Sequence, residues 1–197
     1  MSDKGENMGK TKVRTIIIII IAAMFAAGYY FYLSNKTPKE KEEIQITAVQ
    51  NVLLRNLDTD YPPTPKEVVK FYSEISKCLL NEEYTDEQLE QMADQLLKLY
   101  DDELCQENPR DEYIKSLQSY VNDAKDNKYT ISTYSPSNST DVDFFRKDGR
   151  ECAKLYCTYT IRTGANYSST RQIFVLRKDS SSNHWKILGF DIEKAQQ

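Results

Sequence analysis

The longest apolar run in the chain lies near the N-terminus, over residues 16–33, and it contains no charged residue and no proline. At about 1.5 Å of rise per residue, a helix over this run would span roughly 27 Å, close to the hydrocarbon thickness of a bilayer. Aromatic residues 29–32 at one end and Arg14 at the other are typical of membrane interfaces. We therefore predict a transmembrane helix over residues 15–33. Its membrane-embedded residues would include Ile16, Ile21, Phe25 and Leu33.

A cleaved signal peptide is the alternative interpretation, because the small residues Ala26, Ala27 and Gly28 would suit a cut before Tyr29. The apolar run continues past that point, which favours an uncleaved anchor. Basic residues are denser before the run than after it, so the N-terminus is predicted to be cytoplasmic and the rest extracytoplasmic. The predicted organisation is a cytoplasmic tail (1–14), the membrane helix (15–33), a stalk (34–59), a folded domain (60–193) and a tail (194–197).

Apolar positions recur with helical spacing between residues 44 and 121, and helix start signals divide this region. Residues 44–57 predict a short helix that packs on the domain. Thr64 and Pro65 predict the start of a strong helix that continues to residue 80. A second helix is predicted from Thr85, with its apolar face continuing to Leu104, and a third from the Asn108–Pro109 pair.

From residue 129 onwards the period changes to two, which is typical of strands. Strands are predicted over residues 129–135, 151–162, 169–177 and 184–192, with a short additional one at 142–145. Short turns between successive strands indicate an antiparallel meander. The predicted fold class is α+β: after the transmembrane helix, three helices pack on a curved antiparallel sheet of about four strands.

The segments Tyr61-Pro62-Pro63-Thr64-Pro65-Lys66-Glu67-Val68-Val69 and Trp185-Lys186-Ile187-Leu188-Gly189-Phe190 carry a resemblance to known proteins. The order of helices and strands over about residues 60–193 resembles the nuclear transport factor 2-like superfamily, in which helices and a curved sheet form a cone. The two segments are similar to an uncharacterised family of bacterial single-pass membrane-anchored proteins. The resemblance implies a concave pocket but no catalytic residues, since this superfamily hosts many functions.

The composition of the chain limits the classes of partner that it could bind. The chain carries 26 Lys and Arg against 30 Asp and Glu, a net charge of −4, which argues against nucleic-acid binding. Tyrosine is abundant, with 14 residues, and its amphipathic ring suits the wall of a pocket. The residues predicted to line this pocket are Tyr72, Tyr100, Tyr120 and Tyr159. The expected partners are membrane lipid at the anchor and a protein, or a second copy, at the sheet.

The four cysteines and the single histidine, His184, have no metal-ligand spacing, so we expect neither a metal nor a cofactor. Antiparallel helices and strand alternation exclude the pairs Cys78–Cys105 and Cys152–Cys157. We expect four unpaired thiols. The alternatives are Cys78–Cys157 with Cys105–Cys152, or the crossed pairing.

Carboxylates could act as general acids or bases if the cone buried them. The candidates are Asp101, Asp102, Glu103 and Asp191, for which a solvated or surface role is favoured. The leading hypothesis is a non-catalytic binding or assembly module outside the cytoplasm. The alternatives are a small-molecule-binding domain with a tyrosine-lined pocket, and an acid–base enzyme of the isomerase or dehydratase kind.

Overall fold

Helices come first and strands second, as the change of period predicts. The computed structural model describes residues 46–193. The helices are α2 (Ala48–Leu54), α3 (Pro65–Asn81), α4 (Asp86–Leu99), α5 (Asp102–Glu107) and α6 (Arg110–Asp126). The strands are β1 (Tyr129–Pro136), β2 (Asp143–Lys147), β3 (Arg150–Thr163), β4 (Asn166–Lys178) and β5 (Trp185–Ile192), with a 3₁₀ turn, η1 (Ser139–Asp141), before β2.

The predicted starts of α3 and α4 are confirmed by their hydrogen bonds. The Thr64 hydroxyl accepts from the Glu67 amide at 3.3 Å, and Thr85 and Gln88 exchange the two bonds of a capping box. The predicted cap of the third helix is wrong. Pro109 occupies the N-cap of α6, and Asn108 instead is the C-cap of α5, where its side-chain amide donates to the Leu104 carbonyl.

The second helix ends earlier than predicted, at Leu99. Tyr100 forms a parallel β-bridge with Ile187 of β5, and the Asp101 amide donates to the Ile187 carbonyl at 2.8 Å. A β-bridge needs extended backbone, so the helix cannot continue through Tyr100. The chain then begins the separate helix α5, which the sequence pattern did not predict.

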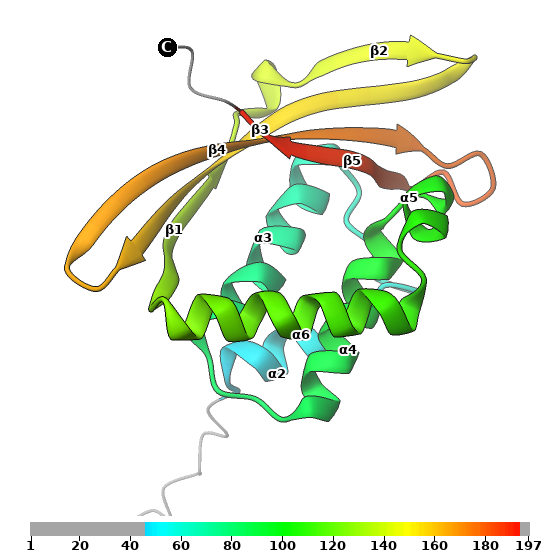
Figure 1. Cartoon of the computed structure of the whole chain (residues 1–197). Coiled ribbons are helices and arrows are strands. Elements are labelled where there is room, and N and C mark those ends of the chain that lie inside the picture. The colour runs from blue at the N-terminus through cyan, green and yellow to red at the C-terminus, as the bar shows by residue number, and fades with distance from the viewer. Residues whose placement is uncertain (1–45, 194–197) are drawn as a thin grey trace, which may run out of the picture. The chain divides into compact units, whose positions relative to one another are not determined.

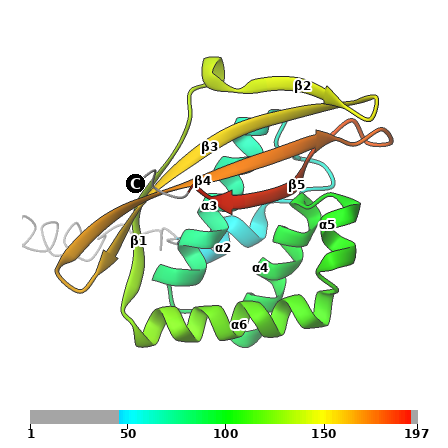
Figure 2. The same cartoon turned by 45° about the horizontal axis from the view of Figure 1, so that its top comes forward.

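The five strands form one antiparallel sheet in the order β1-β3-β4-β5, and β2 pairs with β3 beside β1. The short strand expected at 142–145 is therefore β2, which belongs to the sheet, and the sheet has five strands rather than about four. Register shifts occur where β1 pairs with β3, with Ser132 of β1 as the additional residue, and where β4 pairs with β5, with Leu188 of β5 as the additional residue. Such bulges bend and twist strands, and Figures 1 and 2 show the resulting curvature.

The helices of residues 46–193 all lie on one side of the sheet (Figures 1 and 2). Helix α3 packs directly beneath the sheet, and α6 crosses the end of α3 that lies farther from the sheet (Figure 1). The core lies between these layers; its fully buried members include Phe71, Ile75, Leu155, Phe174, Leu176 and Ile187. Helix α2 contributes Val49 and Val52 to the same core, so the folded unit already includes residues 48–54, within the predicted short helix at 44–57.

The predicted fold class included a transmembrane helix, and this part of the prediction must be corrected. No helix in residues 46–193 combines the length and the apolarity needed to cross a bilayer. The longest of them, α3 and α6, have 17 residues each and carry charged side chains on their outer faces. The predicted span over residues 15–33, with Ile16, Ile21, Phe25 and Leu33, lies outside the described residues. The domain itself is α+β, with helices covering one face of a five-stranded antiparallel sheet.

Candidate ligand-binding cavity

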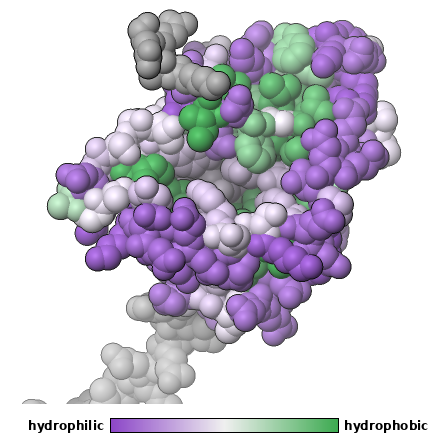
Figure 3. Space-filling view, viewed as in Figure 1, coloured by the Kyte–Doolittle hydropathy of each residue, from purple (hydrophilic) through white to green (hydrophobic). Residues whose placement is uncertain are grey.

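A cavity of about 350 Å³ opens between the sheet and helices α3 and α6. Figure 3 views this side of the molecule: apolar and weakly polar side chains gather between the sheet and α6, whose outer surface is hydrophilic. The wall is formed by Tyr72, Ser76, Leu79, Leu80, Leu96, Tyr100, Tyr113, Leu117, Tyr120, Ile131, Tyr159, Ile161, Thr170, Gln172, Phe190 and Ile192.

The structure places all four of the tyrosines named from the sequence in this one wall. Tyr72 comes from α3, Tyr100 from the break between α4 and α5, Tyr120 from α6 and Tyr159 from β3. Tyr100 and Tyr159 are buried, whereas Tyr120 is 59% exposed and lies at the rim. Elements from both halves of the domain therefore meet at the cavity.

Other wall residues were missed. Tyr113 of α6 lies in the wall but was not among the tyrosines predicted to line the pocket. Thr170 and Gln172 belong to the alternating set of β4 that includes the buried Phe174, so their orientation could have been read from strand period alone. The position of Phe190 could not be predicted from strand period, because its place in the wall depends on the pairing of β5 with β4.

The aromatic rings of the wall pack against one another. Tyr72 meets Phe174 edge-on with ring centroids 5.2 Å apart, and Phe190 at 5.5 Å. Tyr100 lies 5.7 Å from Tyr113, also edge-on. These separations lie within the range at which aromatic pairs attract beyond simple area burial. The cavity is consequently bounded on several sides by interlocked rings.

Two hydroxyl pairs fix the orientation of these rings. The Tyr100 and Tyr113 hydroxyls are 3.0 Å apart. The Tyr159 hydroxyl is 2.7 Å from the buried Ser73 hydroxyl, which donates to the Val69 carbonyl one helical turn earlier. Tyr159 therefore presents its ring to the cavity while its hydroxyl is held inside the core.

The wall is uncharged. It contains no Asp, Glu, Lys, Arg or His among residues 46–193. Burial, which disfavours a phenolate, raises the pKa values of Tyr72, Tyr100, Tyr113, Tyr120 and Tyr159. At neutral pH every tyrosine of the wall thus carries a neutral hydroxyl, which adds no charge to the cavity.

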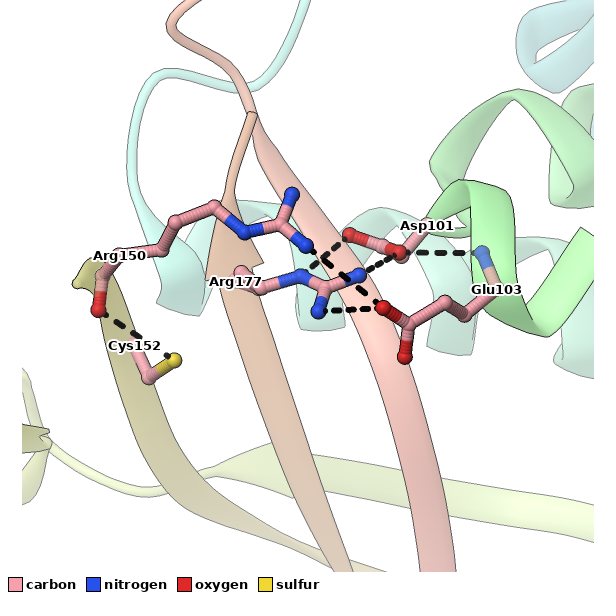
Figure 4. A network of polar contacts seen from close by, with 5 residues as sticks. All are labelled: Asp101, Glu103, Arg150, Cys152 and Arg177. Carbon is pink, nitrogen blue, oxygen red and sulfur yellow. Dashed lines mark hydrogen bonds and ion pairs between the residues drawn. The ribbon is translucent and has the colours of Figure 1, made fainter. Parts of the chain in front are cut away.

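The carboxylates considered as general acids or bases lie elsewhere. Asp101 is buried and accepts two hydrogen bonds from Arg177 of β4, through Nε at 2.9 Å and through Nη2 (Figure 4). Glu103 accepts from Arg177 Nη1 at 2.8 Å. Asp191 is exposed at the end of β5, and Asp102 is exposed at the start of α5. None of the four lines the cavity.

The Arg177 cluster nevertheless acts on the cavity through the backbone. Asp101 follows Tyr100 directly, and its carboxylate also caps α5 by accepting from the Glu103 amide at 3.1 Å (Figure 4). The backbone of Tyr100 is bridged to Ile187 of β5, and the side chain of the next residue, Asp101, is bonded to Arg177 of β4. This double attachment holds the Tyr100 ring in the wall.

A second, polar recess of about 430 Å³ lies beside the turn between β4 and β5. The His184 ring stacks on the Tyr61 ring, with centroids 4.0 Å apart. The Lys186 ammonium lies 4.7 Å from the centroid of the same Tyr61 ring and donates a hydrogen bond to the Lys98 carbonyl. Lys98 pairs with Asp58 at 3.2 Å. Both lysines are therefore already engaged by neighbouring groups. Asp101 and Asp102, two of the carboxylates nominated from the sequence, also line this recess.

The cysteines and the single histidine do not form a metal site in the described residues. All four cysteines are unpaired. Burial raises the pKa of Cys78 to about 11, so its thiol is protonated and unreactive at neutral pH. The Cys157 sulfur lies 3.5 Å from the Ser73 hydroxyl and is part of the core behind Tyr159.

Comparison with known proteins gives one family. The family model described as a domain of unknown function (DUF6715) matches residues 1–190, nearly the whole chain. No curated protein matches the chain.

Proposed function

The chain belongs to the DUF6715 family, and we propose that it is a binding protein that takes a small, uncharged, largely apolar ligand into its tyrosine-lined cavity. The observation that carries this proposal is the chemistry of the wall, in which five tyrosines and several aliphatic residues surround the cavity without one charged side chain.

Size supports the proposal. A cavity of about 350 Å³ lies near the lower end of the roughly 300–1,000 Å³ typical of ligand sites, which are mostly apolar with a few polar groups that orient the ligand. The ligand would therefore be small and compact. Its rings would stack on aromatic neighbours, as the wall residues already do among themselves.

Polar groups at separate points of the wall would orient the ligand. Thr170 and Gln172 contribute a hydroxyl and an amide from β4, and Ser76 contributes a hydroxyl from α3. The Ser76 hydroxyl already donates to the Tyr72 carbonyl at 2.9 Å, but its oxygen can still accept. A ligand with one or two hydrogen-bonding atoms on an apolar body would match this arrangement.

An acid–base enzyme has less support. Such catalysis needs a titratable group within hydrogen-bond reach of the reacting atoms. The carboxylates nominated for that role are either paired with Arg177 or exposed outside the cavity, as Asp101 and Asp191 illustrate. The groups that do line the cavity are tyrosines whose pKa values burial raises away from neutrality.

The test is a titration of the full chain with N-phenyl-1-naphthylamine, a neutral aromatic probe that fluoresces when it leaves water. We expect saturable binding of one probe per chain, and much weaker binding of 8-anilinonaphthalene-1-sulfonate, because nothing in the described wall compensates its buried negative charge.

Two tryptophan variants locate the probe. Thr170→Trp would place an indole in the cavity and should weaken probe binding at least about tenfold by occluding the space. Ser169→Trp adds the same side chain at the next residue of β4, which is exposed and faces the other side of the sheet, and should leave binding unchanged. Equal affinity of both variants for the probe would refute the proposed site.

A further inference from the structure

Strand β2 is an edge strand with an unusual surface. It pairs with β3 and, within residues 46–193, with no other strand, so one row of its backbone groups is unpaired. All five of its residues are exposed. Two of them are consecutive phenylalanines, Phe144 at 59% and Phe145 at 37% exposure. An exposed edge that carries large apolar side chains is a template for pairing with another strand.

The turn after β2 determines which backbone groups point outwards. Lys147 pairs with Arg150 across the two-residue turn Asp148–Gly149, whose φ values of 51° and 76° are both positive, as in a tight hairpin. The residue before such a turn directs its N–H and C=O at the partner strand, and these directions alternate along the strand. Phe144 and Arg146 therefore direct their backbone groups towards the unpaired edge.

The sequence of β2 is complementary to itself when reversed. If a second β2 lies antiparallel to the first with Phe145 opposite Phe145, then Asp143 lies opposite Lys147 and Phe144 opposite Arg146. Each pairing occurs twice because of the two-fold symmetry. We propose that two copies of this chain associate by antiparallel pairing of their β2 strands in this register, which joins their sheets edge to edge.

Every cross-strand neighbour in this arrangement is favourable. Two Asp–Lys pairs join opposite charges, and each Arg146 guanidinium meets a phenylalanine ring across the strands. The outward backbone groups of Phe144 and Arg146 bond to their counterparts, so the edge left open by β3 is closed. Charged residues usually protect an edge from pairing, but in this register they attract the second copy.

The apolar side chains also gain cover on both faces. Phe144 already packs against Trp185 of β5, with ring centroids 5.8 Å apart, and Phe145 lies opposite Cys152 of β3 on the other face. These residues line one shallow groove with Arg146 and Glu151. A second copy would extend each face and remove part of the exposed surface of both phenylalanines from water.

The first experiment is cysteine crosslinking of the full chain under mild oxidation. In the proposed register Phe145 faces its own copy in a non-hydrogen-bonded pair, with Cα atoms about 4.5 Å apart, which a disulfide can bridge. We expect Phe145→Cys to give a covalent dimer when Cys152→Ser is present in every variant compared, because Cys152 lies opposite residue 145 on β3 and could otherwise pair with the new thiol within one chain. Arg146→Cys, the neighbour on the same strand, faces Phe144 of the other copy and should not crosslink. Tyr167→Cys, 63% exposed on β4, is the control for random collision.

The second experiment reverses the charges. Asp143→Lys places like charges opposite each other twice and should weaken dimerisation on the order of tenfold in sedimentation equilibrium. Adding Lys147→Asp exchanges the two charges and should restore the affinity. Association that Asp143→Lys leaves unchanged, a monomer at all concentrations, or equal crosslinking of the Phe145→Cys and Arg146→Cys variants would each overturn the proposal.

Discussion

At the scale of single residues, the Arg177–Asp101 ion pair is the most consequential polar contact of the domain. The two side chains are 8% and 5% exposed, whereas the pair of Arg110 with Asp94 is 47% and 43% exposed. A buried ion pair is strongly destabilising when one partner is removed, because the other is left charged and out of water. An exposed pair has little such effect.

We therefore expect Arg177→Met to lower the free energy of unfolding by about 3–5 kcal/mol, measured by urea denaturation. The matched change Arg110→Met should lower it much less, because that pair is exposed to water. The double variant Arg177→Met with Asp101→Asn should recover most of the loss, because no buried charge remains unpaired and the amide oxygen can still accept the Glu103 N–H at the start of α5. A single-variant loss no larger than that of Arg110→Met would contradict the importance of this pair.

The buried tyrosines predict how stability depends on pH. Their folded-state pKa values lie above the ordinary value of 10.0, and desolvation is the main cause. A group whose folded pKa is raised contributes stability that is complete below its unfolded pKa and is lost above it, because the unfolded chain then releases the proton more readily. The free energy of unfolding should hence fall as the pH rises above about 10.

Urea denaturation at a series of pH values between 7 and 11 measures this effect. Tyr159→Phe should make the free energy of unfolding fall less steeply with pH above pH 10, since it removes one of the buried hydroxyls. The same variant should also lower stability at pH 7 by about 1–2 kcal/mol, because the Ser73 hydroxyl loses a partner 2.7 Å away. A slope unchanged by the substitution would mean that Tyr159 does not contribute to the pH dependence.

At the scale of elements, local signals set where helices begin. Thr85 caps α4 by accepting from the Gln88 amide at 3.2 Å, and Gln88 accepts in return from the Thr85 amide at 3.0 Å. Thr85→Ala should lower the free energy of unfolding by about 1 kcal/mol, whereas Thr85→Ser keeps the hydroxyl and should have a much smaller effect. Thermal and urea denaturation compare the two; equal losses would show that the cap is not responsible.

Helix ends were harder to predict than helix starts. The apolar period that marks α4 continues through Leu104, and only the bridge between Tyr100 and Ile187 interrupts it. That bridge joins residues far apart in the sequence, so no local signal reports it. The inward position of Asp101 follows from the same contact. The start of α5 also has a local signal, because Asp101 is its N-cap and Asp102 and Glu103 occupy its first turn.

At the scale of the whole molecule, the cavity and the edge of β2 use different surfaces. The cavity lies between the sheet and α3 with α6, and no residue of β2 contributes to its wall. Substitutions at sites that share no contacts usually have additive effects. Asp143→Lys, which should weaken dimerisation, should change the affinity for N-phenyl-1-naphthylamine by less than about twofold. A larger change would show that association and ligand binding are coupled.

The α+β class, the strand alternation and the inward direction of three wall tyrosines were predictable because each depends on local periodicity, whereas the place of Tyr100 depends on its bridge to β5. Tyr72 and Tyr120 follow from helical spacing, and Tyr159 from strand alternation. The resemblance to the nuclear transport factor 2-like superfamily stays a prediction. The location outside the cytoplasm depends on residues 15–33, outside the described part of the chain, and stays a prediction as well.

Local chemistry in the chain thus established which segments are helices or strands and which faces are apolar, since capping and amphipathic spacing act over a few residues. Long-range pairing settled the rest. The register of β4 with β5 brings Phe190 to the wall, and the contact of Tyr100 with β5 closes the cavity and buries Asp101 against Arg177. An uncharged cavity is a property of side chains that converge from distant segments, and their convergence exists only once the sheet has curved over the helices.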